Sequence, residues 1–442
     1  MLVDSNIAYD LQLALNSIKK TPVLSALMVA AIGIGIGACM TIITIFYLMT
    51  ANPNPDNSEE IYTYALHNHL TVTEGQEDER PRLMSTYRDA LYILESDIPT
   101  DQSVHYQSWA VYRNSEDGVN PFWELYRLVT PGFFSLFDVP FLYGGAWTQE
   151  QEDSKAMVIV LTRETNDRLF GGENSVGRTV EAGGEYYEVV GVMDHFKPLP
   201  KYFEFDSGFF QEISGALVPF SLTPVIELMK NSGGRSCIEM PEGDDFQSYL
   251  DAECHWLHHW VRLPTPEKRE AFAEMLDNYS LEQRRFGRFQ GPFNNRLFNL
   301  MEWLEHLEIV DGTMTMLIGV ALMFLIVCLL NTNALLFAKF TGRSAEVGLK
   351  RALGCSKKRL FRQHLVEIGL VGLVGGALGL LLALVGLAGI KLLLTDIDDL
   401  ANMNTDLVII AITASIISTL IAGLYPAWRT CQIAPAKYLK SQ

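Results

Sequence analysis

The sequence is short of positive charge. Its 442 residues include 34 lysines and arginines against 52 aspartates and glutamates, which gives a formal net charge of −18. Proteins that bind nucleic acid through its phosphates need the opposite balance, so the composition argues against a nucleic-acid partner. The deficit is concentrated in residues 51–308, which hold 20 basic and 43 acidic residues. The acidity is therefore a property of one long segment.

The sequence also lacks recognisable catalytic or nucleotide-binding motifs. No Ser-His-Asp set or G-x-S-x-G arrangement can be argued. Residues 172–179, GENSVGRT, approach the phosphate-binding pattern G-x-x-x-x-G-K-[ST], but an arginine replaces the lysine and a strand-like segment follows where a helix should begin. We interpret this stretch as a turn, and we expect the chain to bind no cofactor directly and to have no enzymatic activity.

One cluster of metal-ligating residue types does occur. Cys254, His255, His258 and His259 lie close together, and an H-x-x-H spacing on a helix could bind a metal. No further set of carboxylates or thiolates accompanies them, and two tryptophans and a leucine are interleaved. We therefore favour a packed structural segment and expect no metal site.

Charge is also rare in four long apolar runs, and three of them hold none. We predict membrane spans over residues 21–51, 313–338, 365–394 and 407–428. At 1.5 Å per residue each can cross a hydrocarbon core of about 30 Å. A secretory signal is the alternative for the first run, but that run is about twice as long as a normal signal core. Glu367 and Lys391, near the ends of the third run, could snorkel to the membrane surface.

Basic residues gather beside these runs. Residues 339–364 contain one acid, Glu346, and eight basic residues: Lys339, Arg343, Lys350, Arg351, Lys357, Lys358, Arg359 and Arg362. Lys19 and Lys20 precede the first run. The positive-inside rule makes these segments cytoplasmic, together with the tail at 429–442. Residues 52–308 and a short loop at 395–406 then lie in the periplasm of a multi-pass inner-membrane protein.

This orientation sorts the six cysteines. Cys39 and Cys328 fall inside spans, and Cys355 and Cys431 lie on the cytoplasmic side, where thiols stay reduced. Cys237 and Cys254 face an oxidising compartment. They are the one plausible disulfide.

Short-range patterns suggest how the spans are packed and anchored. In residues 1–20, apolar side chains recur at helical spacing, which predicts an amphipathic helix on the inner membrane face, with a frayed terminus as the alternative. The first span pairs Gly33 with Gly37 and the third pairs Gly372 with Gly376. Small residues four apart let another helix approach closely.

The segment between the first two spans mixes strand and helix patterns. Alternating or apolar runs predict strands near residues 61–66, 104–112, 122–129, 156–161, 186–193 and 260–264, and helical spacing predicts helices over 86–95, 163–169 and 266–282. An α+β domain in two lobes follows. Leucines and Met301 at helical spacing predict a stalk helix over 296–312, continuous with the second span.

The basic loop at 339–364 contains a pattern of apolar residues as well as its charges. Apolar residues interleave with its lysines and arginines, and Gly354 breaks the pattern, which predicts a helix–turn–helix. A simple topology determinant is the alternative, but the interleaving favours a structured docking element.

At this point the sequence resembles a known group, the four-span permeases of the MacB and FtsX-like type, also called mechanotransmission ABC transporters. The resemblance rests on EVGLKRALGCS at residues 346–356 followed by basic residues, on GLYPAW at 423–428, and on VTPGFFSLFDVPFLYGG at 129–145. It implies a four-helix transmembrane bundle with a large α+β periplasmic domain inserted between spans 1 and 2.

The resemblance also implies partners. Two permease subunits, identical or related, would sit on two cytoplasmic ABC ATPases that bind ATP and Mg²⁺, with a coupling helix over residues 346–359. Because this chain begins only about 20 residues before its first span, we expect the ATPase on a separate polypeptide. The implied coupling residues are Glu346, Gly348, Arg351, Ala352, Gly354, Ser356 and Arg359. The periplasmic domain would have a porter-like lobe, 52–112 and 216–295, and an inserted distal lobe, 113–215.

The function implied is export of a peptide-like, lipophilic or toxic substrate from the periplasm. A periplasmic adaptor, an outer-membrane channel and membrane lipid are further expected partners. Two alternatives share the four-span plan: lipoprotein extraction, and FtsX-like force transmission to a cell-wall hydrolase.

Overall fold

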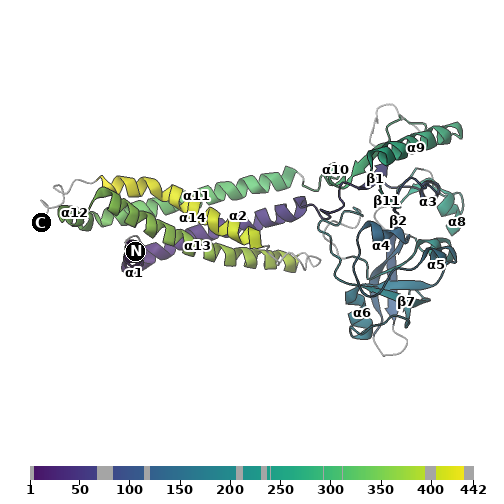
Figure 1. Ribbon diagram of the computed structural model, residues 1–442, viewed down its shortest axis with the longest axis horizontal. Coiled ribbons are helices and arrows are strands. Elements are labelled where there is room, and N and C mark those ends of the chain that lie inside the picture. The colour runs from purple at the N-terminus through teal and green to yellow at the C-terminus, as the bar shows by residue number, and fades with distance from the viewer. Residues whose placement is uncertain are drawn as a thin grey trace. The chain divides into compact units, whose positions relative to one another are not determined.

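The computed structural model describes residues 4–66, 83–113, 120–205, 213–229, 236–238, 240–291, 293–310, 312–393 and 405–432. The chain divides into two compact units, which we call the helical unit, residues 1–50 and 310–442, and the inserted domain, Ala51–Ile309 (Figure 1). The predicted loop at 395–406 and the tail at 429–442 lie mostly outside the described residues.

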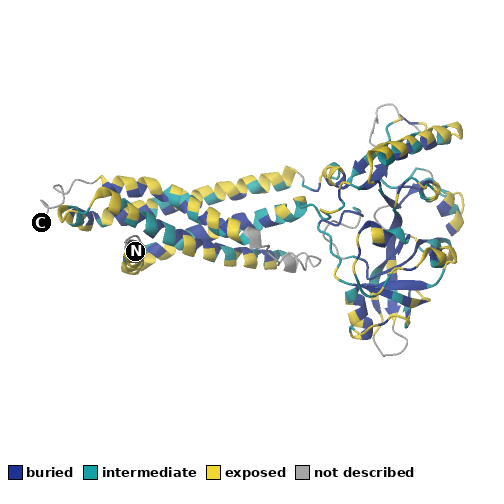
Figure 2. Ribbon diagram, in the orientation of Figure 1, coloured by how far each residue is buried: buried dark blue, intermediate teal, exposed yellow. Residues whose placement is uncertain are grey.

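The helical unit contains the four predicted spans. Its helices are α1 Asp4–Lys20, α2 Pro22–Thr50, α11 Gly312–Gly342, α12 Ser344–Ala352, α13 Lys357–Leu393 and α14 Thr405–Cys431. Four of them, α2, α11, α13 and α14, are long and apolar enough to cross a membrane. Figure 2 shows α11 exposed along much of its length, and its exposed side chains are largely apolar. Such a surface suits lipid or another apolar helix better than water.

Glycines let α13 pack closely on two neighbours. A Cβ placed on Gly37 of α2 would lie 2.8 Å from Cβ of Leu382 and 3.1 Å from the carbonyl oxygen of Gly379, both on α13. One placed on Gly33 would lie 2.8 Å from Leu378. Elsewhere on α13, Gly372 and Gly376 would bring added Cβ atoms to within 3.0 Å of α14. All four predicted packing glycines therefore lie at helix–helix contacts.

The inserted domain is built on one large sheet. Its strands are β1 Ile61–Ala65, β2 Gln102–Arg113, β3 Phe122–Val129, β4 Phe141–Gly144, β5 Val158–Leu161, β6 Thr179–Ala182, β7 Glu185–Met193, β8 Ala216–Pro219, β11 His258–Arg262 and β12 Arg296–Asn299. The order is β12-β1-β11-β2-β3-β8-β5-β7-β4, and β6 pairs with both β2 and β7. Pairing is antiparallel except for β3–β8 and β5–β7. A separate two-stranded sheet joins β9 Ser236–Cys237 to β10 Cys254–His255.

Several helices, most of them short, flank this sheet. They are α3 Tyr87–Leu94, α4 Gly132–Leu136, α5 Gln149–Asp153, α6 Arg163–Phe170, α7 Thr223–Ile226, α8 Phe246–Asp251, α9 Pro266–Arg285 and α10 Leu300–His306, with a 3₁₀ turn at Phe220–Leu222. Thr86, Thr162 and Thr265 cap the starts of α3, α6 and α9 by accepting a hydrogen bond from the third helical N–H. These three helices and the six strands expected from alternation are all present.

The turn interpretation of residues 172–179 is confirmed. Gly172 and Gly177 have positive φ, and the residue after the turn, Thr179, begins β6 rather than a helix. A phosphate-binding loop needs a helix N-terminus at that point.

The stalk helix predicted over 296–312 is wrong. Residues Arg296–Asn299 form β12, which pairs with β1, and Asn299 then caps the separate helix α10 through a reciprocal hydrogen-bonded pair with Glu302. A residue with positive φ, Glu308, follows α10, and α11 begins only at Gly312. The leucine spacing that suggested one helix is divided between a strand and a short helix.

The division of the inserted domain into two lobes stays a prediction. The strand order of the large sheet does not match the predicted lobe boundaries. Strand β8, which the sequence assigns to the porter-like lobe, lies between β3 and β5 of the predicted distal lobe. Among the described residues, one cluster of buried apolar side chains surrounds Tyr106, Tyr126 and Trp256, and another surrounds Tyr64, Phe272 and Leu276.

Candidate functional site

A buried ion pair lies where the two middle spans approach the basic segment. Lys339, in the last turn of α11, places Nζ 2.7 Å from a carboxylate oxygen of Glu367 in α13, and the two side chains are 0% and 7% exposed. Nζ of Lys339 also donates to Oγ of Ser25 in α2, at 3.1 Å. Three helices therefore meet at one buried ammonium group.

Helix α1 is tied into the same cluster through Ser17. The Ser17 hydroxyl contacts the Glu367 carboxylate, and the Arg343 guanidinium donates to both the hydroxyl and the carbonyl oxygen of Ser17, the latter at 2.9 Å. Arg343 sits between α11 and α12, so this contact links the start of α12 to α1. We call Ser17, Ser25, Lys339, Arg343 and Glu367 the charge cluster.

A second ion pair fastens α1 to α13. Nε of Arg362 lies 2.8 Å from a carboxylate oxygen of Asp10, which is almost fully buried. Asp10, Ala14 and Ser17 form the buried face of α1, whereas Leu11 and Leu15 are exposed. The predicted amphipathic helix is present, but its buried face is mostly polar and small, and of its apolar residues Ile18 packs on the bundle while Leu11 and Leu15 face outward.

The basic segment forms the predicted helix–turn–helix. Helix α12 ends at Ala352, Gly354 adopts φ +91°, and α13 starts at Lys357. Gly354 suits this left-handed position because it has no Cβ. Ser356 caps α13, accepting a hydrogen bond from the Arg359 N–H at 3.3 Å. The expected loop over 339–364 is therefore mostly helix, since α11 continues to Gly342 and α13 begins eight residues early.

The predicted coupling residues all lie on this helix–turn–helix, which has one buried and one exposed face. Val347 packs with Leu360 and Cys431 in a small apolar cluster. On the other side, Leu349 is 54% and Leu353 is 80% exposed. Among the predicted coupling residues, Gly348 is buried, Arg351 is half-buried, and Glu346, Ala352, Gly354, Ser356 and Arg359 are exposed.

Glu346 lies at the edge of the charge cluster. Lys350, one turn later on α12, is 3.0 Å away. The hydrogen bond from Lys350 holds the pKa of the Glu346 carboxyl below its usual range, and the charges of Lys350, Lys20 and Arg343 act in the same direction. Glu346 is therefore ionised and surrounded by cations at neutral pH.

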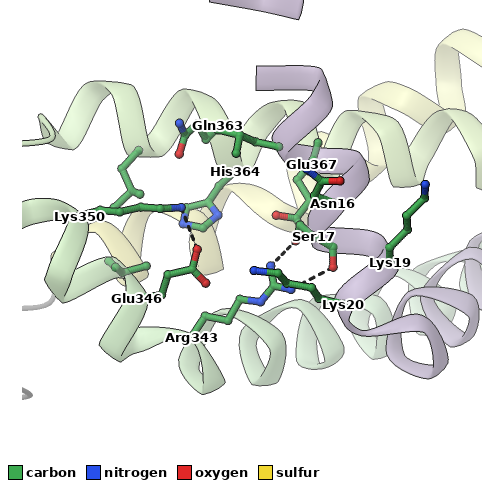
Figure 3. Close-up of a pocket in the computed structure, with 14 residues that line it drawn as sticks. Asn16, Ser17, Lys19, Lys20, Arg343, Glu346, Lys350, Gln363, His364 and Glu367 are labelled. Carbon is green, nitrogen blue, oxygen red and sulfur yellow. Dashed lines mark hydrogen bonds and ion pairs between the residues drawn. The ribbon is translucent and has the colours of Figure 1, made fainter. Parts of the chain in front are cut away.

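A cavity of about 360 Å³ opens between α1, α12 and α13 (Figure 3). Its charged lining consists of Lys19, Lys20, Arg343, Lys350, Glu346 and Glu367. His364 of α13 lines it as well, in contact with the ring of Phe340 at 4.2 Å between centroids.

Sequence reasoning missed the charge cluster. We expected Glu367 to snorkel to the membrane surface, and this is wrong, because its carboxylate is buried against Lys339. The sequence did contain a signal for this pair, because one base, Lys339, and one acid, Glu367, each lie at the end of an apolar run. The side chain of Lys391 lies outside the described residues.

The cysteine–histidine segment of the inserted domain is divided between two strands. Cys237 and Cys254 form a disulfide that joins β9 to β10. His258 and His259 lie on strand β11, so neighbouring side chains point to opposite faces and the helical H-x-x-H spacing does not arise. Nδ1 of His259 lies 2.8 Å from the Tyr64 hydroxyl, and the His258 ring stacks on that of His105.

Comparisons with known proteins agree with this architecture. A family model described as the MacB-like periplasmic core domain matches residues 25–278, and one described as the FtsX-like permease C-terminal matches residues 318–435. A macrolide export ATP-binding/permease protein MacB from Bdellovibrio bacteriovorus is 22% identical over 335 residues, covering 73% of this chain and 43% of that protein. The chain thus spans less than half the length of this MacB relative.

Other relatives are closer to this chain in extent. An uncharacterised ABC transporter permease, YknZ of Bacillus subtilis, is 21% identical to this chain over 383 residues. The alignment covers 83% of this chain and 83% of YknZ. The periplasmic region of MacB from Actinobacillus actinomycetemcomitans aligns in structure with 58% of this chain and 96% of its own, at 15% identity and a TM-score of 0.37. Because one family model alone matches more than half of its length, the chain belongs to the MacB/FtsX family of ABC transporter permeases.

Proposed function

We propose that this permease receives the energy of ATP hydrolysis from a separate ABC ATPase through α12 and the turn at Gly354. It passes that motion to the inserted domain, which drives export of a peptide-like, lipophilic or toxic substrate from the periplasm. The relatives that the chain matches over most of their length, YknZ and YvrN of Bacillus subtilis, are named as ABC transporter permeases, which supports a partner ATPase.

The exposed apolar side chains of α12 and its turn carry this proposal. Leu349 and Leu353 lie among basic residues on an element that buries its opposite face. Two exposed leucines in a polar segment are costly in water and are typical of a protein interface. By the positive-inside rule this surface faces the cytoplasm, where an ATPase can reach it.

The charge cluster supplies the mechanical link. Arg343, at the start of α12, is held by Ser17 of α1, which also contacts Glu367 of α13, and Glu367 pairs with Lys339 of α11. A displacement of α12 must therefore move α1, α11 and α13 together or break buried polar contacts. Helix α2 ends at Thr50, immediately before the inserted domain, and α11 begins immediately after it.

The proposal is tested by Leu353→Ser in the full chain, assayed with its partner ABC ATPase. Leu353 is exposed, so the substitution should leave the fold intact while removing apolar contact area with the ATPase. We expect the permease-dependent ATPase rate to fall about tenfold, the effect of about 1.4 kcal/mol. Leu281→Ser, at an exposed leucine of the inserted domain, is the matched control and should have no effect. Equal rates for both variants would count against docking at α12.

A further inference from the structure

The cavity between α1, α12 and α13 has an excess of positive charge. Four cationic side chains line it, Lys19, Lys20, Arg343 and Lys350, against two carboxylates. Its volume of about 360 Å³ far exceeds the roughly 10–15 Å³ that one water requires. The space is large enough for a polyatomic group.

Both carboxylates already have cationic partners. Glu346 is paired with Lys350 at 3.0 Å, and Glu367 with Lys339 at 2.7 Å. Lys339 is not part of the lining, so it neutralises Glu367 from behind the cavity wall. Lys19, Lys20 and Arg343 then give the cavity a net positive field, which favours an anion.

A hydrogen-bonding group is also available there. His364 is about nine-tenths buried and lines the cavity, and among the described residues its Nε2 atom has no hydrogen-bond partner (Figure 3). A buried polar atom without a partner costs free energy comparable to a lost hydrogen bond. A ligand oxygen that accepted a hydrogen bond from this ring would remove that cost.

Part of the remaining lining is apolar, beside the polar side chains of Asn16, Ser17 and Gln363. Leu13, Ala14, Val347 and Leu360 face the same cavity as the lysines. Leu11 and Leu15 on the outer side of α1 are exposed, as expected of a helix that lies against a bilayer. The cavity therefore offers cationic groups and apolar walls together, which matches an amphiphile better than a free ion.

We propose that this cavity binds a phosphate-bearing anion, and that its source is the head group of an anionic phospholipid whose glycerol end rests on the apolar wall. Basic pockets beside spanning helices are suited to such head groups. A bound lipid would bridge Lys19 and Lys20 on α1 to Arg343 at the start of α12, and so would hold the coupling element against α1. The inference does not depend on which ATPase the chain uses.

The test compares two double variants of the delipidated full chain in neutral detergent. Phosphatidylglycerol and phosphatidylcholine with identical acyl chains are titrated, and the retained lipid is counted by native mass spectrometry. Lys19→Gln with Lys20→Gln removes two exposed cations from the cavity. Lys357→Gln with Lys358→Gln removes two exposed cations from the first turn of α13, outside the cavity lining, and is the matched control.

The wild-type chain should retain phosphatidylglycerol in preference to phosphatidylcholine. Each lysine contributes roughly fivefold in affinity for an anionic lipid, so the cavity variant should bind about 25-fold more weakly and the control should change less than twofold. Equal retention by all three chains, or an equal loss in both double variants, overturns the proposal. Inorganic phosphate forms a separate arm: if it binds with the same dependence on Lys19 and Lys20 while phosphatidylglycerol is not retained, the lipid source is overturned and phosphate recognition stands.

Discussion

The ion pair between Lys339 and Glu367 is a buried feature with a large effect on stability. Removing two charges from water is expensive, and their attraction offsets this cost only while both partners are present. Each partner also has a hydroxyl contact, from Ser25 and Ser17 respectively, which satisfies further hydrogen-bonding capacity. The pair therefore tolerates loss of both charges better than loss of one.

A double-mutant cycle checks this argument. Lys339→Met or Glu367→Met alone leaves an uncompensated buried charge and should destabilise the helical unit by about 3–5 kcal/mol. The double variant should be destabilised by clearly less than the sum of the two single effects. Thermal unfolding of the full chain in detergent measures all four proteins. Additive losses would show that the two charges do not stabilise each other.

His259 offers a pH-dependent measurement in the inserted domain. Burial lowers its pKa to about 3, against 6.5 in an unfolded chain. The folded state therefore keeps His259 neutral while the unfolded state takes up a proton below pH 6.5, so stability is lost as the pH falls from that value. Between pH 7 and pH 5 this one group should cost about 2 kcal/mol.

The comparison variant for this pH effect is His259→Gln, which cannot take up the proton and keeps a polar group near Tyr64. Wild-type chain should lose more thermal stability between pH 7 and pH 5 than this variant does. Parallel pH profiles for the two proteins would show that another group controls the acid sensitivity.

Residue types predicted some contacts from the sequence and not others. The glycine pairs and the two cysteines of the inserted domain were found because spacing and compartment restrict their roles. Lys339 and Glu367 were assigned to different segments, a loop and a span, and only the packing of α11 against α13 brings them together. A pattern along one helix does not show which residue of a second helix will face it.

At the scale of elements, α13 organises the helical unit. It packs closely on α2 through Gly33 and Gly37 and on α14 through Gly372 and Gly376. It also forms ion pairs with two other helices, through Arg362 with α1 and through Glu367 with α11. A change in the spacing between α13 and any one neighbour therefore alters the contacts of several helices.

Gly37→Ala tests the close contact between α2 and α13. The added Cβ would lie 2.8 Å from Cβ of Leu382, so the helices must separate, and we expect a stability loss of about 1–3 kcal/mol, as for other overpacked cores. Gly319→Ala on α11 is the control, because nothing lies within 4 Å of its added Cβ. It should be neutral or slightly stabilising, since alanine favours helix. A similar midpoint of thermal unfolding for the two variants would contradict the packing role.

Gly354→Ala tests the turn between α12 and α13. The left-handed conformation costs a non-glycine residue about 1–2 kcal/mol, so α12 should shift or fray while the inserted domain keeps its fold. We expect the permease-dependent ATPase rate to decrease several-fold. Gly369→Ala, within α13 with open space around its Cβ, should leave that rate unchanged. Full activity of the Gly354 variant would exclude a strict requirement for this turn.

The type of an element, helix or strand, was predictable where its apolar residues followed a single period. Helices α3, α6 and α9 follow capping threonines, and the apolar runs became four long helices. The stalk failed because leucines at 297, 300 and 304 fit a helical period even though the first lies in β12. Pairing with β1 determines that residues 296–299 form a strand. Because β1 lies more than 200 residues earlier, the local sequence does not reveal this pairing.

At the scale of the whole molecule, each unit has its own buried core. One apolar cluster centres on Met28, Ile32 and Ile36 in the helical unit, and two others lie in the inserted domain. We therefore expect two thermal transitions in the full chain, each belonging to one unit.

Substitutions assign the two transitions. Gly37→Ala should lower one midpoint only, and a shift from pH 7 to pH 5 should lower the other through His259. Differential scanning calorimetry of the full chain resolves both. A single transition that moves with either perturbation would mean that the units unfold cooperatively.

The pairing of Lys339 with Glu367 has an electrical consequence. Moving one elementary charge through a membrane potential changes its free energy by about 2.3 kcal/mol per 100 mV. Two opposite charges that move together carry no net charge, so a displacement of this pair does no work against the voltage. This pair therefore adds no voltage dependence to a movement of α11 and α13.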